Sequence, residues 1–107
     1  MSKLNQQACK PIPESSPALT AAKVADYLKE LPGWAIDAGQ LTKTFPFKNY
    51  YETTAFLNAT AWISHRQDHH PDIALGYNKI TMRYSTHTVK GLSINDFICA
   101  ARVEALL

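Results

Sequence analysis

The chain has 107 residues, a length that fits one domain built around one hydrophobic core. A net charge of +2, with lysines and arginines scattered singly, excludes the basic patch of a nucleic-acid-binding protein. No apolar run approaches the roughly 20 residues of a membrane span, and the start of the chain lacks the apolar segment of a signal peptide. We therefore expect a cytoplasmic protein that binds neither nucleic acid nor a membrane.

The two cysteines lie far apart in the sequence. Cys9 belongs to a polar segment and Cys99 to an apolar helical pattern. Such a pair matches neither a disulfide framework nor a Cys-x-x-Cys metal motif. We expect Cys99 to be a small residue of the core.

The first nineteen residues are predicted to form a flexible leader, and residues 20–107 the folded domain. Residues 1–17 contain three prolines and few apolar side chains. A segment of this composition has little apolar surface to bury, so we expect it to lie outside the core.

The domain is predicted to begin with a helix that has Thr20 as its N-cap and runs through Leu31. Pro32 and Gly33 should end the helix. Two strands, over residues 34–36 and 41–47, are expected on either side of a turn. One apolar stripe of the helix consists of Val24, Tyr27, Leu28 and Leu31.

A second helix is predicted from a capping box formed by Asn49 and Glu52 to about Gln67. Pro71 disfavours helical dihedral angles at His70, so the helix should end just before the histidine pair. Its buried face is predicted to hold Ala55, Ala59, Trp62 and Ile63. We expect aromatic side chains to belong to the core rather than to a ligand site, namely Trp62, Phe45, Phe47 and Phe97.

Two further strands are predicted over residues 73–75 and 80–86, joined through a turn at 76–79. In the second, Ile80, Met82 and Tyr84 alternate with polar residues, which is typical of a half-buried strand. A capping box at Ser93 and Asp96 then opens the last helix. Its apolar face is predicted to consist of Ile94, Phe97, Ile98, Ala101 and Ala105.

The predicted order of elements is α-β-β-α-β-β-α. Short hairpins join the strands of each pair, which favours an antiparallel sheet. Three amphipathic helices can all bury their apolar faces on one side of a four-stranded sheet. We therefore predict an α+β two-layer sandwich, with a four-stranded antiparallel sheet and three helices on one face.

All four histidines fall between His65 and His87. The segment Asp68-His69-His70-Pro71 contains two of them, and the segment Ser85-Thr86-His87 contains a third. Imidazole has an unperturbed pKa of about 6.5 and exchanges protons near neutral pH. This concentration of histidines predicts a proton-transfer site or a ligand pocket.

Three interpretations of the histidines remain open on residue types alone. His65 and His69 have the i, i+4 spacing of two zinc ligands on a helix, although no glutamate follows His65 and no cysteine lies near them in the sequence. Alternatively, the pair is structural and only ends a helix. In the third interpretation, several imidazoles surround a small substrate and act as general acids and bases without a metal.

The spacing of several motifs resembles the signature of the pterin-4a-carbinolamine dehydratases, over the whole chain from Thr20 onward. Two parts of the chain are similar to the bacterial branch, namely the leader that contains Cys9 and the ending Asn95-Asp96-Phe97-Ile98 with Ala100-Ala101-Arg102. The motifs that carry the resemblance are Gly33-Trp34, Phe45-x-Phe47-Lys48, Asp68-His69-His70-Pro71, Tyr77-Asn78-Lys79, Ser85-Thr86-His87 and Gly91-Leu92-Ser93 with Asp96.

The resemblance implies a hydro-lyase. The family removes water from 4a-hydroxytetrahydropterin, a by-product of aromatic amino-acid hydroxylases, and the product, quinonoid dihydropterin, is then recycled to the pterin cofactor. Loss of water from a carbinolamine needs only proton transfers, so neither a metal nor a cofactor is expected. The resemblance also implies a homodimer or homotetramer and a functional link to an aromatic amino-acid hydroxylase.

The resemblance further assigns roles to residues. His69, His70 and His87 would surround the pterin, with His69 and His87 transferring protons and His70 mainly binding and orienting the substrate. Asp96 would either orient an imidazole or only cap the last helix, and Pro71 would support the histidine pair. The substrate-binding residues would be Asp68, His69, His70, Ser85, Thr86 and His87.

Two other functions are compatible with this resemblance. Some members of the family serve as dimerisation or assembly proteins, a role that would not need the histidines. The substrate could also be a different pterin, such as one linked to the molybdenum cofactor. The sequence does not specify the side chain of the pterin or the number of subunits.

Overall fold

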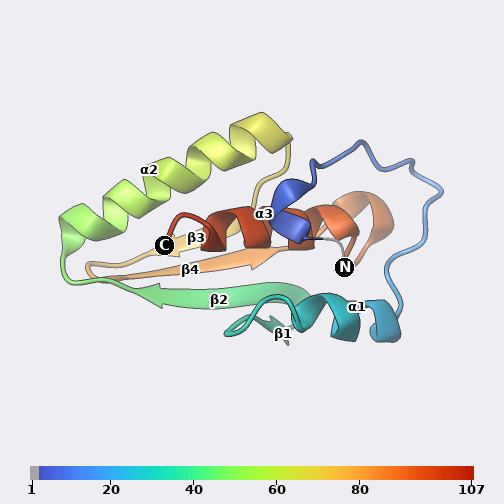
Figure 1. Cartoon of the computed structure of the whole chain (residues 1–107), viewed down its shortest axis with the longest axis horizontal. Helices are drawn as coiled ribbons and strands as arrows, with labels where there is room; N and C mark the ends of the chain where they lie inside the picture. The colour runs from blue at the N-terminus through green and yellow to red at the C-terminus, as the bar shows by residue number, and fades with distance from the viewer. Residues whose placement is uncertain (1–2) are drawn as a thin grey trace.

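The computed structural model describes residues 3–107 and confirms the predicted α+β order (Figure 1). A four-stranded antiparallel sheet has the strand order β1-β2-β4-β3, and the helices pack on one face of it. No helix within residues 3–107 is both long and apolar enough to cross a membrane. The elements are η1 (Leu4–Gln6), α1 (Ala21–Leu28), β1 (Ala35–Asp37), β2 (Gln40–Pro46), α2 (Tyr50–Gln67), β3 (Asp72–Leu75), β4 (Lys79–Tyr84), η2 (His87–Val89) and α3 (Ile94–Glu104).

The sheet consists of two hairpins joined through their inner strands. The turn of the first hairpin has positive φ at both central residues, 51° at Ala38 and 77° at Gly39. Two such residues are typical of the tight turns whose twist matches that of paired strands. β2 and β4 then pair from Leu41 opposite Tyr84 to Pro46 opposite Lys79, which places β4 in the interior of the sheet and β3 at its edge.

The core lies between the sheet and the helices. Ile80, Met82 and Tyr84 are fully buried on β4, as their alternation predicts. α3 is buried on most of its surface, not on one face only, because η1 and α2 cover the sides that the sheet does not. The predicted apolar face is less buried at its two ends, where Ile94 is half-buried and Ala105 is exposed.

α1 begins where the sequence predicts and ends earlier. The Thr20 side chain accepts a hydrogen bond from the Lys23 amide at 3.2 Å, as an N-cap does. The α-helix stops at Leu28, and Leu31 reaches the core from the turns that follow. The predicted helix was therefore three residues too long, because a buried leucine fits the helical stripe without belonging to the helix.

α2 has the predicted ends. The Asn49 side chain accepts from the Glu52 amide at 2.9 Å, while Glu52 accepts from the Lys48 amide at 3.1 Å instead of completing the box at Asn49. The last helical residue is Gln67.

The predicted buried face of α2 is only partly correct, because Ile63 packs against the core cluster whereas Ala55 and Trp62 are exposed. Thr53, Phe56 and Thr60 face the core, whereas Trp62 is 60% exposed and packs on the surface against His65. Each buried threonine hydroxyl donates to a carbonyl oxygen of its own helix at 2.8 Å, so its burial leaves no unpaired polar group. Polar residues on the buried side remove the apolar stripe from which a face is inferred.

The leader packs against the domain. Leu4 is 1% exposed and belongs to the main core cluster, which contradicts the expectation that the leader lies outside the core. The Lys10 amide donates to the Asn95 side chain at 3.2 Å, and Asn95 donates back to the Lys10 carbonyl at 2.8 Å. These partners lie 85 residues away, so no local pattern predicts them. Met1 and Ser2 lie outside the described residues, and the predicted domain boundary at residue 20 stays a prediction.

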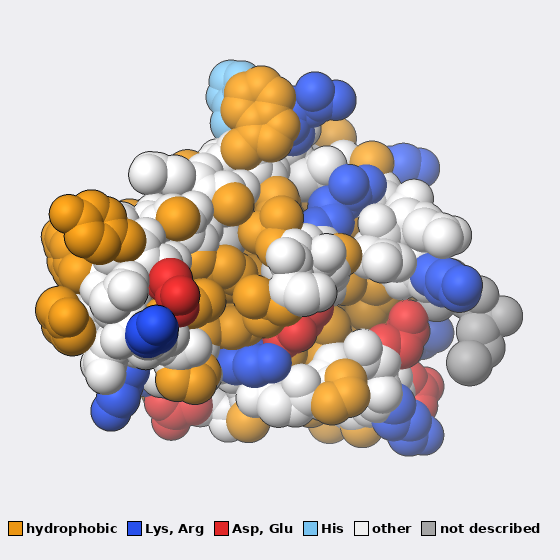
Figure 2. Space-filling model, turned by 60° about the vertical axis from the view of Figure 1, so that its left-hand side comes forward, with side chains coloured by type: hydrophobic (Ala, Val, Ile, Leu, Met, Phe, Trp, Pro, Cys, Tyr) orange, Lys and Arg blue, Asp and Glu red, His pale blue; other side chains and the backbone are white. Residues whose placement is uncertain are grey.

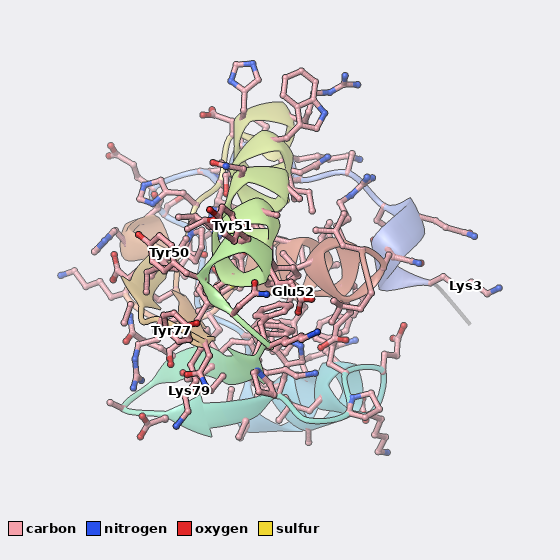
Figure 3. The ribbon with its side chains drawn as sticks, turned by 90° about the vertical axis from the view of Figure 1, so that its left-hand side faces the viewer. Lys3, Tyr50, Tyr51, Glu52, Tyr77 and Lys79 are labelled. Carbon is pink, nitrogen blue, oxygen red and sulfur yellow. The ribbon has the colours of Figure 1, made fainter. Side chains whose placement is uncertain are left out.

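Exposed aromatic side chains gather where α2 begins, beside the turn between β3 and β4 (Figures 2 and 3). Tyr50 and Tyr77 stack with ring centroids 6.4 Å apart, and Tyr51 next to them is 84% exposed. This end of α2 is opposite to the end that precedes the histidine pair.

We predict that Leu4→Ala destabilises the protein although Leu4 lies in the leader. Truncating a buried leucine costs about 2 kcal/mol or more, which corresponds to a fall in Tm of roughly 10 °C for a domain of this size. Thermal unfolding followed by circular dichroism measures the change. Asn5→Ala, at the exposed neighbouring position, is the control and should leave the Tm within a few degrees. Equal melting temperatures for the two variants would contradict the packed leader.

Candidate functional site

A hollow lies where α2 ends, β3 begins and β4 ends. Its volume is about 310 Å³, at the lower end of the range for small-molecule sites. The structure brings together in it all six residues that the sequence predicts to bind substrate, although they come from two segments. The lining residues are Asp68, His69, His70, Asp72, Arg83, Ser85, Thr86, His87 and Thr88.

The C-terminus of α2 positions the histidine pair. Asp68 adopts a left-handed conformation, with φ 52° and ψ 44°, directly after the last helical residue. The amides of Asp68 and His69 both donate to the Ser64 carbonyl, which satisfies the helix end and turns the chain away from the helix axis. Pro71 is buried just before β3. His69 and His70 therefore lie in the short connection between helix and edge strand.

A tight loop after β4 positions His87. The Thr86 amide donates to the Gly91 carbonyl at 2.8 Å, so the loop closes on itself across η2. Lys90 completes the reversal with φ 53°. This closure leaves His87 exposed at the rim of the hollow.

Asp96 is the buried anchor of the site. Its carboxylate is fully buried and accepts three hydrogen bonds, as a carboxylate removed from water requires. Oδ2 accepts from the Ser93 amide at 2.9 Å and from the Thr86 hydroxyl at 2.8 Å, and Oδ1 accepts from Nε2 of His69 at 2.6 Å. The two roles considered for Asp96 are thus both present, because one oxygen caps α3 and the other holds an imidazole.

The environment of His69 raises the pKa of its imidazole above the usual 6.5. Burial alone would lower this pKa, but the hydrogen bond and charge of Asp96 outweigh burial, and the charges of Cys9 and Asp68 act in the same direction. A carboxylate only accepts hydrogen bonds, so Nε2 of His69 carries the proton and Nδ1 is the nitrogen left for exchange.

Tyr84 forms the wall behind His69. The two rings are nearly parallel, at 10°, with centroids 6.1 Å apart. Burial raises the pKa of the Tyr84 hydroxyl, and within residues 3–107 this hydroxyl has no hydrogen-bond partner. Tyr84 is therefore a neutral, packed surface that fixes the plane of the imidazole.

The other two histidines of the hollow are exposed. Nδ1 of His70 lies 3.4 Å from the carbonyl oxygen of Pro71, while His87 projects from the opposite segment. His65 does not line the hollow, because it is exposed on α2 and packs against Trp62. Within the part of the chain that the structure describes, no three histidine, cysteine or acidic side chains are grouped so as to hold a metal ion.

Three lining residues were not predicted: Asp72, Arg83 and Thr88. Arg83 lies opposite Asp72 in the register of β3 and β4, and its guanidinium donates to Asp37 at 2.8 Å. The alternation along β4 carries a signal for Arg83, because it places this residue on the same face as Ser85. No comparable pattern points to Asp72 and Thr88, whose positions depend on how the loops fold.

The comparisons with known proteins agree with the fold and the motifs. A family model described as "Pterin 4 alpha carbinolamine dehydratase" matches residues 17–106. A protein of Nitrosospira multiformis is 50% identical over 103 residues, which cover 96% of this chain and 91% of the relative. A protein of Hydrogenovibrio crunogenus is 47% identical over 106 residues, covering 97% and 94%. Both relatives are named, provisionally, as pterin-4-alpha-carbinolamine dehydratases.

Two solved structures are also similar to this chain. A "transcriptional coactivator/pterin dehydratase" from Brucella melitensis superposes with a TM-score of 0.79 at 27% identity, over 83% of this chain and 97% of the other. A pterin dehydratase-like protein described as a RuBisCO assembly factor of the alpha-carboxysome gives 0.61 at 30% identity, over 71% and 90%. With the family model matching almost all of the domain, this chain belongs to the pterin-4a-carbinolamine dehydratase family.

Proposed function

We propose that the protein is a hydro-lyase that dehydrates 4a-hydroxytetrahydropterin to quinonoid dihydropterin, by histidine acid/base catalysis without a metal or cofactor. One observation carries the proposal beyond family membership. Three histidines from two distant segments line a single hollow, and one of them is held by a fully buried carboxylate.

The chemistry matches what imidazoles supply. A carbinolamine carries a hydroxyl and an amine nitrogen on neighbouring atoms. To lose water, the hydroxyl must receive a proton as its bond to carbon breaks, and the ring nitrogen must give one up. Both transfers are efficient when the donor and acceptor have pKa values near the working pH. Histidine meets this condition at neutral pH.

His69 is the better-defined proton-transfer group. Asp96 binds Nε2 and favours the imidazolium form, which leaves Nδ1 able to donate a proton when charged and to accept one when neutral. Tyr84 and Asp96 restrict the ring from two sides. A ring held in this way loses little freedom when the substrate binds.

We assign the second proton transfer to His87 and substrate orientation to His70. His87 lies on the loop after β4, so it can act on a different substrate atom from His69. His70 is next to His69 in the chain and is partly turned toward its own backbone at Pro71. Asp68 and Ser85 would bind the polar edge of the pterin. The Thr86 hydroxyl is engaged with Asp96, so Thr86 would act mainly by positioning.

We predict unequal effects for the three histidines. His69→Ala and His87→Ala should mainly lower kcat, by roughly 10–100-fold, because the remaining histidine replaces part of the 10²–10⁴-fold that one acid or base contributes. His70→Ala should mainly raise KM. The His69→Ala/His87→Ala double variant should approach the spontaneous rate. Dehydration of enzymatically generated 4a-hydroxytetrahydropterin is the assay.

His65→Ala is the matched control, since this histidine lies outside the hollow and should leave kcat and KM unchanged. Circular dichroism establishes that each variant is folded. A folded double variant with wild-type kinetics would contradict the catalytic proposal. It would favour a binding or assembly role instead, such as the one described for the carboxysome protein.

We predict that Asp96→Asn changes the tautomer of His69, so that Nδ1 carries the ring proton in place of Nε2. The Ser93 amide can only donate, so the asparagine oxygen must face it, and the amide NH₂ then points at Nε2 of His69. Nε2 must lose its proton, which lowers the pKa of His69 and leaves the wrong tautomer for exchange. We expect kcat to fall at least tenfold and the His69 titration, followed by NMR, to shift to lower pH.

Stability should respond to pH with a defined sign. Because the folded protein raises the pKa of His69, the ion pair with Asp96 is complete below about pH 6.5 and is lost as the pH rises through the folded pKa. The Tm difference between wild type and Asp96→Asn should therefore grow as the pH falls from about 8 to 6. Asp72→Asn, in the same hollow, should show no such trend. An unchanged His69 titration in Asp96→Asn would contradict the assignment.

We predict that activity does not depend on a metal. Prolonged chelation followed by the dehydration assay should leave kcat unchanged, because proton transfer alone accomplishes the reaction. Loss of activity that added zinc restores would instead support the interpretation built on His65 and His69.

Two features implied by the resemblance stay predictions, namely the homodimer or homotetramer and the link to an aromatic amino-acid hydroxylase. The cytoplasmic location, which we expect from the composition of the chain, also stays a prediction. Self-association is supported by the exposed edge of the sheet at β3, where Ile73 and Leu75 are both more than one-third exposed.

A further inference from the structure

The two cysteines meet in space although they stand 90 positions apart. Sγ of Cys9 lies 3.5 Å from Sγ of Cys99, and both are free thiols. No sequence motif pairs them, since one belongs to the leader and the other to α3. This contact exists whether or not the protein has the proposed dehydratase activity.

The backbone around Cys9 is held in place by hydrogen bonds to two helices. The Cys9 amide donates to the Gln67 side chain at 2.8 Å, at the end of α2. The next residue, Lys10, exchanges two hydrogen bonds with Asn95 on α3. Figure 1 shows the leader passing beside α3 and the end of α2. The proximity of the thiols is therefore built into the packing of the leader.

The two thiols differ in access. Cys9 is partly exposed and lines hollows on both of its sides, one of which it shares with His69 and the other with Trp62. Cys99 is fully buried. A small oxidant in solution can therefore reach Cys9, whereas burial shields Cys99 from it.

The thiols also differ in their acidity. A hydrogen bond from Cys99 lowers the pKa of the Cys9 thiol, and the charges of His69 and Arg102 act in the same direction against burial and Asp96. The same hydrogen bond and burial raise the pKa of Cys99. Because the thiolate is the reactive form of cysteine, Cys9 is the nucleophile of the pair.

We propose that Cys9 and Cys99 are a peroxide-responsive pair that closes a reversible disulfide between the leader and α3. The Cys9 thiolate attacks one oxygen of hydrogen peroxide, the O–O bond breaks, and with one proton the products are a sulfenic acid and water. The Cys99 sulfur then attacks the sulfenic sulfur, and its proton leaves with the hydroxyl as a second water. Two thiols are oxidised by two electrons, and one peroxide is reduced.

The geometry needs little adjustment for this bond. A disulfide has an S–S length of about 2.05 Å, so the sulfurs must approach each other by about 1.5 Å. Cys9 lies in an irregular segment after η1, so a small shift of its side chain interrupts no helix or strand there. The bond would close a loop of about 90 residues and thereby restrict the unfolded chain strongly.

Closing the disulfide fixes one wall beside the candidate site. Residues 9–12 line a hollow that also contains Asp68, His69, Thr86 and Thr88, all of which line the histidine hollow as well. The Cys99 thiol also lies 3.9 Å from the carbonyl oxygen of His69. Oxidation therefore acts at the segment that carries the histidine pair and at the helix that carries Asp96.

The test uses the full chain, reduced and freed of reductant, at micromolar concentration, with a small excess of hydrogen peroxide. We expect both thiols to become unreactive toward iodoacetamide and the mass of the denatured monomer to fall by two hydrogen atoms, about 2 Da. The Tm should rise by roughly 10 °C. Dithiothreitol should reverse all three changes.

Two variants separate the roles of the cysteines. Cys99→Ala should trap the first step as a sulfenic acid on Cys9 that reacts with dimedone, with no gain in Tm. Cys9→Ser, which alters the partly exposed position, should leave Cys99 reduced under the same treatment. The proposal is overturned if the wild-type thiols stay reactive while free cysteine is oxidised. It is equally overturned if oxidised wild type appears only as a disulfide-linked dimer.

Discussion

The site depends on a single carboxylate that has no access to water. Asp96 is fully buried, and a buried carboxylate is tolerated only where hydrogen-bond donors surround it. Its three donors come from the connection after α2, the loop after β4 and the N-cap residue of α3. Satisfying one charge therefore joins the connection after α2 to the loop and helix start that carry Asp96, 27 residues further along the chain. The carboxylate that binds the imidazole of His69 therefore also holds the loop after β4 and the N-cap of α3 in place.

The two faces of the sheet have different roles, since one packs in the core and the other contributes side chains to the histidine hollow. On β4, alternate side chains enter the core or line the histidine hollow, with Met82 and Tyr84 on one side and Arg83 and Ser85 on the other. Tyr84 connects the two functions, because it belongs to the core and stacks on His69. The packed core thus makes the site rigid, because a side chain of the core holds the imidazole more firmly than a loop alone would.

Local patterns predicted the features that depend on neighbours in the chain. Thr20 and Asn49 cap their helices, and the alternation of β4 holds, because capping and pleating involve residues a few positions apart. The motif spacing also predicted which residues meet in the hollow, through resemblance and not through geometry.

Features that depend on distant partners were missed. The leader was expected outside the core because its segment contains three prolines and few apolar side chains. The partners that bury Leu4 are supplied by the packing of η1 on α3. The buried face of α2 was misassigned in part, because the hydroxyls of Thr53 and Thr60 are satisfied by carbonyl oxygens one turn earlier and can therefore be buried. The contact between Cys9 and Cys99 follows from the leader's path and from no motif at all.

The packed leader has a practical consequence for attaching tags and labels to this protein. Leu4 is buried in the core cluster, so a fusion partner joined next to it would disturb that packing. The opposite terminus offers more room, because Leu107 is 69% exposed and follows the last turn of α3. An affinity tag, a fluorophore or a surface-coupling group is better placed after Leu107, where it leaves the leader, the thiol pair and the wall beside His69 undisturbed.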